Sequence, residues 1–299
     1  MTARSRLPAE LGPGAFTVAR AFELSVSRGR LRNPGLEVPT RGLRRPPADH
    51  FDVVDHARGF ASVLPADIAF SHLTAARLHG LPTPRPWPGV DEALHVMRDH
   101  GRPRIERAGC TNHRGLETRA VVDVRGVRAT GPVDTWCDLA GEWSPMDLLA
   151  AADVLLRRGT IEAEGLRAAA RSRLGRRHAG RLLIPAALAR PGAASPGESL
   201  ARWWFWRWGL PEPELNVPVL DADGGWLAIA DFVWRGPRVV GEYDGDVHRT
   251  DRDAWQRDRE RRASIEDSGW AYVDMTARSF SAAGPREALR RRLIRLLGS

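Results

Sequence analysis

The 299-residue chain contains no lysine, so all 45 residues counted as lysine or arginine are arginines. A high-GC coding bias explains this as well as function does, but a catalytic site that requires lysine is excluded. Cysteine is almost as scarce. Cys110 and Cys137 are too few and too far apart for a disulfide framework or a four-ligand zinc site, which fits a reducing compartment.

Long apolar runs are also missing. The N-terminus lacks the apolar stretch of a signal peptide, and runs such as 182–188 are too short to span a bilayer. We therefore expect a cytoplasmic protein without a membrane partner. The apolar content of 42% and charged content of 27% are typical of folded proteins, and the length predicts two or three domains. A net charge of +8 favours a polyanionic partner, although membrane-surface and ribosomal proteins share this property.

The N-terminal segment has the order of a winged helix-turn-helix. From Ala15 the residues FTVARAFEL predict a helix, 25–27 a turn, RGRLR a second short helix, and LEVPTRGLRR a wing. The segment between Val26 and Pro47 contains six arginines and only one acidic residue, Glu37. Four of the arginines are candidate DNA contacts: Arg28, Arg30, Arg32 and Arg41. The alternative is a solvated basic loop.

The middle of the chain predicts helices at 51–63 and 71–79, a Pro-rich loop at 82–89 and three short strands, LHVMR, AVVDV and GVRAT. Further helices are expected at 133–140, 145–157 and within 161–189. The residues ARPGAASPGE then predict a domain boundary. We expect four parts: 1–85 (winged helix-turn-helix and helical extension), 86–160 (α/β region), 161–194 (helical linker) and 195–299 (nuclease-like domain).

The last part predicts a helix at 198–208, strands at 214–220, 226–234 and 239–244, a helix near 252–267, a strand at 270–275 and a helix at 286–297. Such mixed order indicates an α/β or α+β fold. The tryptophans of the first helix (203, 204, 206 and 208) could stack on bases, but an apolar helix of this kind is normally buried.

Two strands of this part bring acidic residues together. If the hairpin is centred on Gly236-Pro237, positions that sum to 473 face each other, so Asp231 faces Glu242, with Cβ atoms roughly 5 Å apart. Asp244 falls on the same face by strand alternation. Like charges so placed need compensation, and Mg²⁺ is a hard cation that takes carboxylate ligands and activates water for phosphodiester cleavage.

Four other residues extend this candidate site. Glu198 opens the preceding helix, where it could simply cap the N-terminus. His248 follows the second strand and could be an ordinary surface histidine. Asp258 and Arg261 are spaced for an i,i+3 ion pair.

These residues together resemble the very-short-patch-repair-like branch of the PD-(D/E)XK nucleases. The resemblance covers about a hundred residues: Glu198, Asp231-Phe232, the run from Glu242 to Gly245 with His248, Asp258 with Arg261, and Gly269-Trp270. It implies a restriction-endonuclease-like core in which Asp231 and Glu242 bind Mg²⁺ or Mn²⁺, Glu198 supports them and His248 serves as general acid-base. Asp244 stands where the superfamily has its lysine, which leaves an active and an inactive site both open.

The N-terminal half, through SHLTAARLHGLP and GPVDTWCDLA, resembles AbiE-type antitoxins, which join a winged helix-turn-helix to a second domain. We therefore expect a Mg²⁺-dependent DNA endonuclease of defence or repair. The alternatives are a non-catalytic antitoxin or transcriptional repressor with a degenerate nuclease fold, and an RNA-directed nuclease. Fold analogy does not separate them.

Overall fold

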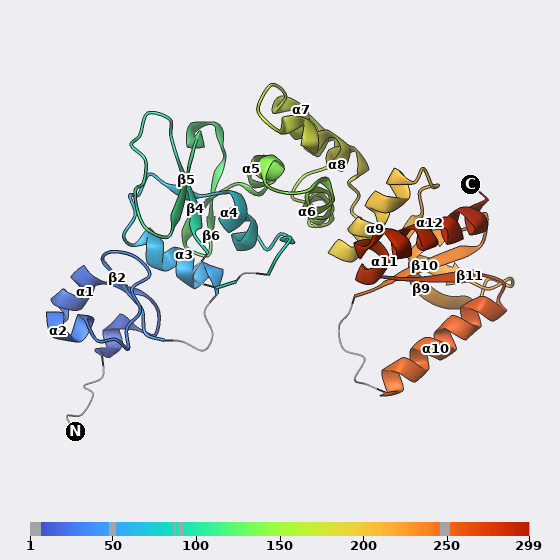
Figure 1. The fold of residues 1–299 in the computed structure, drawn as a ribbon, viewed down its shortest axis with the longest axis horizontal. Helices are drawn as coiled ribbons and strands as arrows, with labels where there is room; N and C mark the ends of the chain where they lie inside the picture. Colours follow the sequence, from blue (N-terminus) through green and yellow to red (C-terminus); the bar gives the residue numbers. More distant parts are fainter. Residues whose placement is uncertain (1–6, 48–51, 87, 90–91, 246–251, 299) are drawn as a thin grey trace. The chain divides into compact units, whose positions relative to one another are not determined.

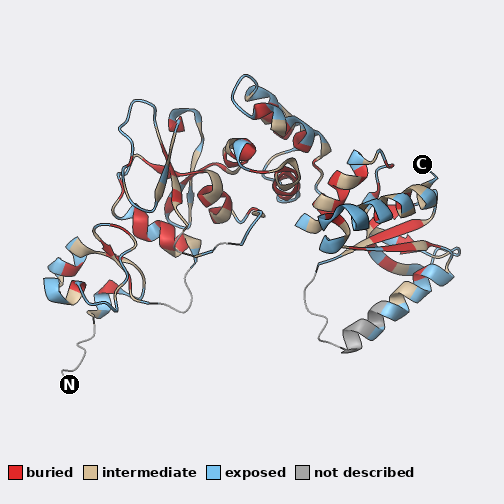
Figure 2. Ribbon diagram, in the orientation of Figure 1, coloured by how far each residue is buried: buried red, intermediate tan, exposed pale blue. Residues whose placement is uncertain are grey.

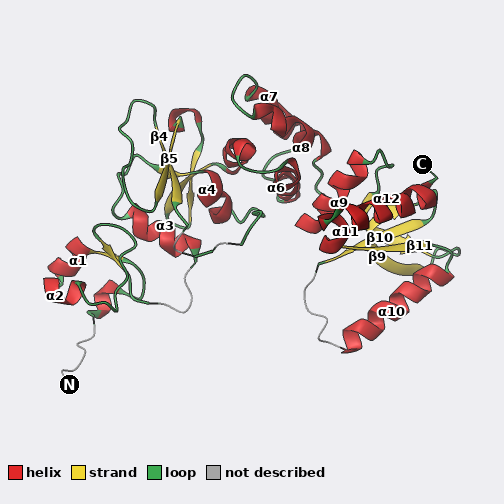
Figure 3. Cartoon of the chain, viewed as in Figure 1, coloured by secondary structure: helices red, strands yellow, loops and turns green. Residues whose placement is uncertain are grey.

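A computed structural model describes residues 7–47, 52–86, 88–89, 92–245 and 252–298 of the chain. Side chains 252–255, 257 and 258 lie outside this description. The chain forms two compact units, residues 1–142 and 143–299. Both are mixed α/β structures in which helices cover β-sheets (Figure 3), so the predicted fold class is confirmed at this level. Among the described residues no helix is long and apolar enough to cross a membrane.

The first unit begins with short elements. They are a 3₁₀ turn at Ala9–Leu11, β1 (Phe16–Thr17), α1 (Val18–Glu23), α2 (Arg28–Leu31) and β2 (Leu43–Arg44). Thr17 caps α1 and Ser27 caps α2, each accepting a backbone hydrogen bond from the residue three positions on. β1 pairs antiparallel with β2. The predicted helix from Ala15 therefore starts three residues later, because 16 and 17 are extended.

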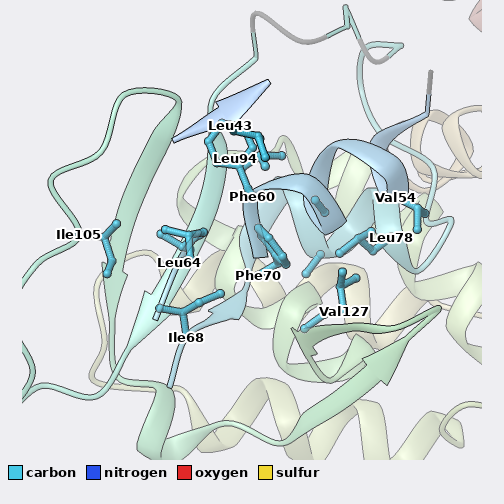
Figure 4. Close-up of a cluster of buried hydrophobic side chains, with 14 residues drawn as sticks. Leu43, Val54, Phe60, Leu64, Ile68, Phe70, Leu78, Leu94, Ile105 and Val127 are labelled. Atoms are coloured by element: carbon cyan, nitrogen blue, oxygen red, sulfur yellow. The ribbon is translucent and has the colours of Figure 1, made fainter. Parts of the chain in front are cut away.

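A five-stranded sheet of order β5-β4-β3-β7-β6 follows in the same unit. Its elements are α3 (Val53–Ala61), β3 (Ala69–Phe70), α4 (His72–Leu78), β4 (Leu94–Arg98), β5 (Cys110–Arg114), β6 (Val121–Val124), β7 (Val127–Thr130) and α5 (Pro132–Asp138), with 3₁₀ turns at Leu116–Thr118 and Leu139–Gly141. Phe60 of α3 lies in an apolar core with Phe70 and Leu94 (Figure 4). Leu43 belongs to the same core, so the N-terminal elements pack onto α3.

The second unit starts with α6 (Pro145–Arg157), α7 (Ala163–Ser172), a 3₁₀ turn at Ala179–Leu182 and α8 (Leu183–Leu188). A four-stranded sheet of order β11-β10-β9-β8 follows. Its elements are α9 (Pro196–Arg207), β8 (Glu214–Leu220), β9 (Trp226–Trp234), β10 (Val239–Asp244), α10 (Arg252–Asp267), β11 (Ala271–Thr276), α11 (Ala277–Ser281) and α12 (Ala283–Leu297). Only β10 and β11 pair in parallel; the other pairs are antiparallel.

Helices cover both faces of this second sheet (Figure 1). Phe205 of α9 and Leu289 of α12 share one core with Phe232. On the opposite face, Ile265 of α10 packs with Val233 and Val240. Burial is accordingly concentrated on the central strands (Figure 2). Of the tryptophans in and just after α9, Trp203 is buried and Trp208 stacks on Phe280, whereas Trp206 is exposed.

The unit boundary differs from the predicted one. The ARPGAASPGE segment lies inside the second unit, and the chain divides between Glu142 and Trp143. The physical reason is a buried ion pair that links α6 to α9: Arg202 Nη1 lies 2.7 Å from Asp153 Oδ2, and the two side chains are 4% and 1% exposed. Ser199 donates a further hydrogen bond of 2.7 Å to Asp153. Helices α6 to α8 thus belong to the same compact unit as the second sheet.

Candidate active site

The β9–β10 hairpin has the register that the sequence predicts. Three residue pairs share the sum 473: Trp234–Val239, Val233–Val240 and Phe232–Gly241. The next positions in this register are Asp231 and Glu242. The Tyr243 amide donates a hydrogen bond of 2.8 Å to Asp231 Oδ2, so the aspartate carboxylate is held against the neighbouring strand. Sequence periodicity and turn position were sufficient to place these two acids together.

Both acids lie on the α10 side of the sheet. Val233 and Val240, which have the same strand parity, belong to the core beneath α10, whereas Phe232 belongs to the opposite core. Two residues of this side contact Glu242 Oε2: Arg261 Nη2 at 2.5 Å and the Tyr272 hydroxyl at 2.9 Å. The other glutamate oxygen, Oε1, is buried and has no hydrogen-bond partner among the described residues.

Glu198 reaches the same region from the N-terminus of α9. Ser195 is the N-cap and accepts from the Glu198 amide at 3.2 Å. The Glu198 carboxylate, 4% exposed, accepts from the Ala194 amide at 2.8 Å and from Asn216 Nδ2 at 2.7 Å. The residue therefore takes part in capping, and it is also near enough to Asp231 to raise the pKa of that carboxyl.

A glycine makes this approach of α9 to the sheet possible. A Cβ on Gly197 would lie 2.0 Å from Cε1 of Tyr243, a distance at which atoms overlap. The helix start and β10 are in direct contact here only because position 197 has no side chain. This glycine was not among the sequence-predicted site residues, although it precedes Glu198 directly.

Burial is the main reason that the Asp231 pKa is raised from 3.8 to about 6. The Tyr243 amide opposes this shift, the negative charges of Glu198 and Glu242 add to it, and Arg261 opposes it. We call Glu198, Asp231 and Glu242 the acidic cluster. A carboxyl with so perturbed a pKa among other acids marks a candidate functional site.

The acidic cluster is less tightly gathered than a complete metal centre. Among the described residues, only one group of three histidine, cysteine or acidic side chains has ligand atoms that all lie within 4.8 Å of one another, and it is His72, His95 and His113. Asp231 and Glu242 are the two side chains of the acidic cluster that could hold a metal directly. Glu198 is engaged by two donors.

The remaining predicted residues have different outcomes. Asp244 is at the exposed end of β10, paired in register with Thr276 of β11. His248 and the side chain of Asp258 lie outside the described residues. The Asp258–Arg261 pair stays a prediction, whereas the contact of Arg261 with Glu242 was not predicted, because α10 and β10 are brought together only by the tertiary fold.

Three of the four predicted DNA-binding arginines are exposed. Arg28, Arg32 and Arg41 are open to solvent and Arg30 is half-buried. Two other arginines of the segment have structural partners. Arg44 donates to the Leu31 carbonyl at 2.9 Å and buried Arg45 pairs with Glu37, which reduces the basic surface to fewer side chains than the sequence suggested.

A second group of side chains, the histidine cluster of His72, His95 and His113, has no signature in the sequence. Its members are 23 and 18 positions apart and have no local motif. They meet because β3 leads into His72, while His95 and His113 stand on the adjacent parallel strands β4 and β5. Only the strand order could have revealed it.

The fold and these sites define a two-unit mixed α/β protein, and no family model matches its sequence. Two proteins of Mycobacterium tuberculosis are similar to it: the uncharacterized protein MT2308 of strain CDC 1551 / Oshkosh and the uncharacterized protein Rv2248 of strain ATCC 25618 / H37Rv. Each is 31% identical over 202 residues, which cover 67% of this chain and 71% of the relative. The chain belongs to the family of these two proteins. Because both relatives are uncharacterized, membership of this family does not indicate which activity the chain has.

Proposed function

We propose that the protein is a divalent-metal-dependent endonuclease that cleaves DNA phosphodiester bonds. The observation that carries this proposal is the approach of Glu198 of α9 to Asp231 and Glu242 of the sheet, with the Asp231 pKa raised to about 6. Two carboxylates held side by side in a partly buried place are unfavourable by themselves. A bound cation offsets their repulsion.

The residues present fit Mg²⁺ or Mn²⁺. Their donor atoms are carboxylate oxygens, which hard cations prefer, and Glu242 Oε1 is buried without a partner among the described residues. Asp231 and Glu242 would hold the ion. When bound, it would lower the pKa of a water and neutralise charge on the phosphate.

The chain's own residues have separable tasks. Glu198 adds negative charge beside Asp231, and its two donors fix its position. Tyr272 orients Glu242, and Arg261, a charged donor 36% exposed, could turn to a phosphate oxygen. At pH 7 Asp231 is mostly ionised, and below its pKa of about 6 it becomes protonated. We assign general acid-base assistance to His248, which lies outside the described residues.

Two finer aspects of the fold belong to this proposal. The order of α9, three antiparallel strands, α10 and a parallel β11 supports a restriction-endonuclease-like core. The short α1 and α2 followed by the β1–β2 pair support a winged helix-turn-helix. Exposed Arg28, Arg32 and Arg41 would then contact DNA phosphates.

The test is incubation of the purified protein with plasmid, single-stranded DNA and RNA, in Mg²⁺, Mn²⁺ or EDTA. We expect metal-dependent DNA cleavage that falls by at least about 10²-fold in Asp231→Asn and in Glu242→Gln. Glu287→Gln is the matched control, since Glu287 is an exposed acid of α12 paired with Arg290. Cleavage by the Asp231→Asn, Glu242→Gln double variant at the wild-type rate would refute the assignment of the active site. Cleavage of RNA but not of DNA would show that the substrate is RNA.

A second function is favoured by the Arg261–Glu242 contact. This ion pair already compensates one acid of the cluster, as expected of a degenerate site that no longer takes a metal. The protein would then be a DNA-binding antitoxin or transcriptional repressor. Salt-sensitive DNA binding with no cleavage in any metal would select this function.

A further inference from the structure

We infer that the histidine cluster of the first unit is a binding site for a transition-metal ion of the Zn²⁺ class. His72, His95 and His113 each offer one ring nitrogen, and these atoms all lie within 4.8 Å of one another. Three imidazoles with an open fourth position are a donor set that Zn²⁺ commonly uses. The histidine cluster belongs to the first unit of the chain and the acidic cluster to the second.

One distance within the cluster is near that of shared coordination. His113 Nε2 lies 3.0 Å from His95 Nδ1. Two nitrogens bound tetrahedrally to one zinc at about 2.0–2.1 Å are roughly 3.3 Å apart, so a small displacement would open this contact for an ion. The His72 ring is stacked on the His113 ring, with centroids 3.5 Å apart, so it would have to turn before its nitrogen could share an ion with His113.

The rings are in the protonation state that binds metals. Burial lowers the pKa of all three histidines, to about 3 for His72 and for His113. The neighbouring charges act too. His95 lowers the pKa of His72 and of His113, Arg119 lowers that of His72, and Asp138 raises that of His113. Neutral imidazole is the ligand form, so an ion would not have to displace protons at pH 7.

Acidic groups lie around the imidazoles, as they do around many metal-bound histidines. Glu142 Oε1 is 4.0 Å from His95 Nδ1. Asp138 pairs with Arg119 at 2.6 Å, and the Ser71 hydroxyl lies 3.1 Å from His72 Nδ1, which orients that ring. Glu142 favours a cation at the cluster, whereas Arg119 compensates the charge of Asp138; the Ser71 contact limits the rotation of the His72 ring.

The backbone at His72 has an unusual, left-handed conformation. His72 is the first residue of α4 and has φ of 47°, a conformation that non-glycine residues rarely adopt. This conformation brings the ring from the end of β3 to the two histidines on β4 and β5. A bound ion would thus connect α4 to the strands β4 and β5 and stabilise the first unit.

The proposal is tested with ZnCl₂ and the full chain by calorimetry, in the Asp231→Asn, Glu242→Gln background so that binding at the acidic cluster does not contribute. We expect one Zn²⁺ per chain with a Kd below about 1 μM, weakened at least about 100-fold in His113→Asn and in His95→Asn. His100→Asn is the control, because His100 is an exposed histidine paired with Glu117 outside the cluster. MgCl₂ should give no heat in this background.

Bound Co²⁺ provides a second measurement that does not depend on the stability of one variant. Its visible d–d absorption should match three nitrogen donors in the parent protein and should disappear in the His72→Gln protein. Circular dichroism shows whether each variant is folded. No zinc binding by the parent protein, or equal binding by parent, His95→Asn and His113→Asn proteins, would overturn the proposal.

Discussion

Arg261 of α10 and Glu242 of β10 form an ion pair in which Nη2 lies 2.5 Å from Oε2. The Tyr272 hydroxyl shares the same carboxylate oxygen at 2.9 Å. One charged and one neutral donor therefore hold a single acid of the candidate site. Their separate replacement distinguishes the effect of charge from that of positioning.

Arg261→Gln should raise the affinity for Mg²⁺ several-fold, because a positive charge beside the acid repels a second cation by about 1 kcal/mol at a partly exposed site. Cleavage should nevertheless fall, since the charge is then missing at the phosphate. Tyr272→Phe removes a neutral donor and should change Mg²⁺ affinity by less. Calorimetric titration of both proteins measures this, and equal affinities would show that Arg261 is too far from the ion to matter.

Asp231→Asn should make the folded state more resistant to alkaline pH. The folded pKa of Asp231 is raised from 3.8 to about 6, so its contribution to stability is complete below about pH 4 and is lost as pH rises through 6. The upper bound of this loss is about 3 kcal/mol for two pH units, and we expect about 1–2. Urea unfolding without metal should show the variant gaining on the wild type by less at pH 4, where most of the contribution is still present, than at pH 8, where it is lost. A gain of the same size at both values would mean that the acid is not perturbed.

Gly197→Ala should destabilise the second unit and impair the site together. The added Cβ would overlap the Tyr243 ring at 2.0 Å, and overpacking of this kind costs about 1–3 kcal/mol. Gly284→Ala in α12 is the matched control, because a Cβ there meets nothing within 4 Å and alanine favours a helix. In thermal melts, the Tm of Gly197→Ala should lie below that of the wild type and the Tm of Gly284→Ala slightly above it. A neutral Gly197→Ala would show that Tyr243 moves aside freely.

Replacement of Arg28, Arg32 and Arg41 by alanine should reduce the dependence of DNA affinity on salt. Each phosphate contact adds about 0.9 to the slope of log affinity against log salt, so the triple variant should lose a slope of about 2–3. Arg176→Ala, an exposed arginine of the second unit, should leave the slope unchanged. Fluorescence anisotropy with a short duplex between 50 and 200 mM salt, the range over which the effect is large, gives both values. An unaltered slope in the triple variant would assign this segment to a solvated loop.

Arg202→Met should cost the second unit about 3–5 kcal/mol, because it leaves Asp153 charged and buried without its partner. Burial already raises the Asp153 pKa, a shift that Arg202 and Ser199 oppose. The double variant Asp153→Asn, Arg202→Met should recover much of the loss. Urea unfolding of the wild type, the single variants Asp153→Asn and Arg202→Met, and the double variant forms the double-mutant cycle. Additive losses would mean that the two residues are not coupled.

The sequence predicted the second sheet closely where its side-chain pattern was strong. The bounds 214–220, 226–234 and 239–244 agree with β8, β9 and β10, because apolar residues alternate there and Gly236-Pro237 marks the turn. The same alternation places Asp231 beside Glu242. By contrast, β5 has the residues CTNHR with little burial, and its extended form depends on pairing with β4.

The helical segment 161–189 was predicted in type but not in its interruptions. His178 adopts φ of 65° between α7 and α8, where the local composition is only arginine-rich. The predicted position of the domain boundary differs from the observed one for another reason. A Pro- and Gly-rich sequence indicates an irregular backbone, and only the burial of Asp153 against Arg202 shows that the irregular segment stays inside one body.

The same buried pair has a consequence for the order in which the chain folds during synthesis. Asp153 and Arg202 are 49 positions apart, so the α6 carboxylate leaves the ribosome well before the guanidinium that neutralises it. Contacts between such distant positions form late because the closing of the intervening chain costs entropy. We therefore expect helices α6 to α8 to pack onto α9 only after α9 has been synthesised. Residues 1–142, which form their own unit, have left the ribosome by then and can fold first.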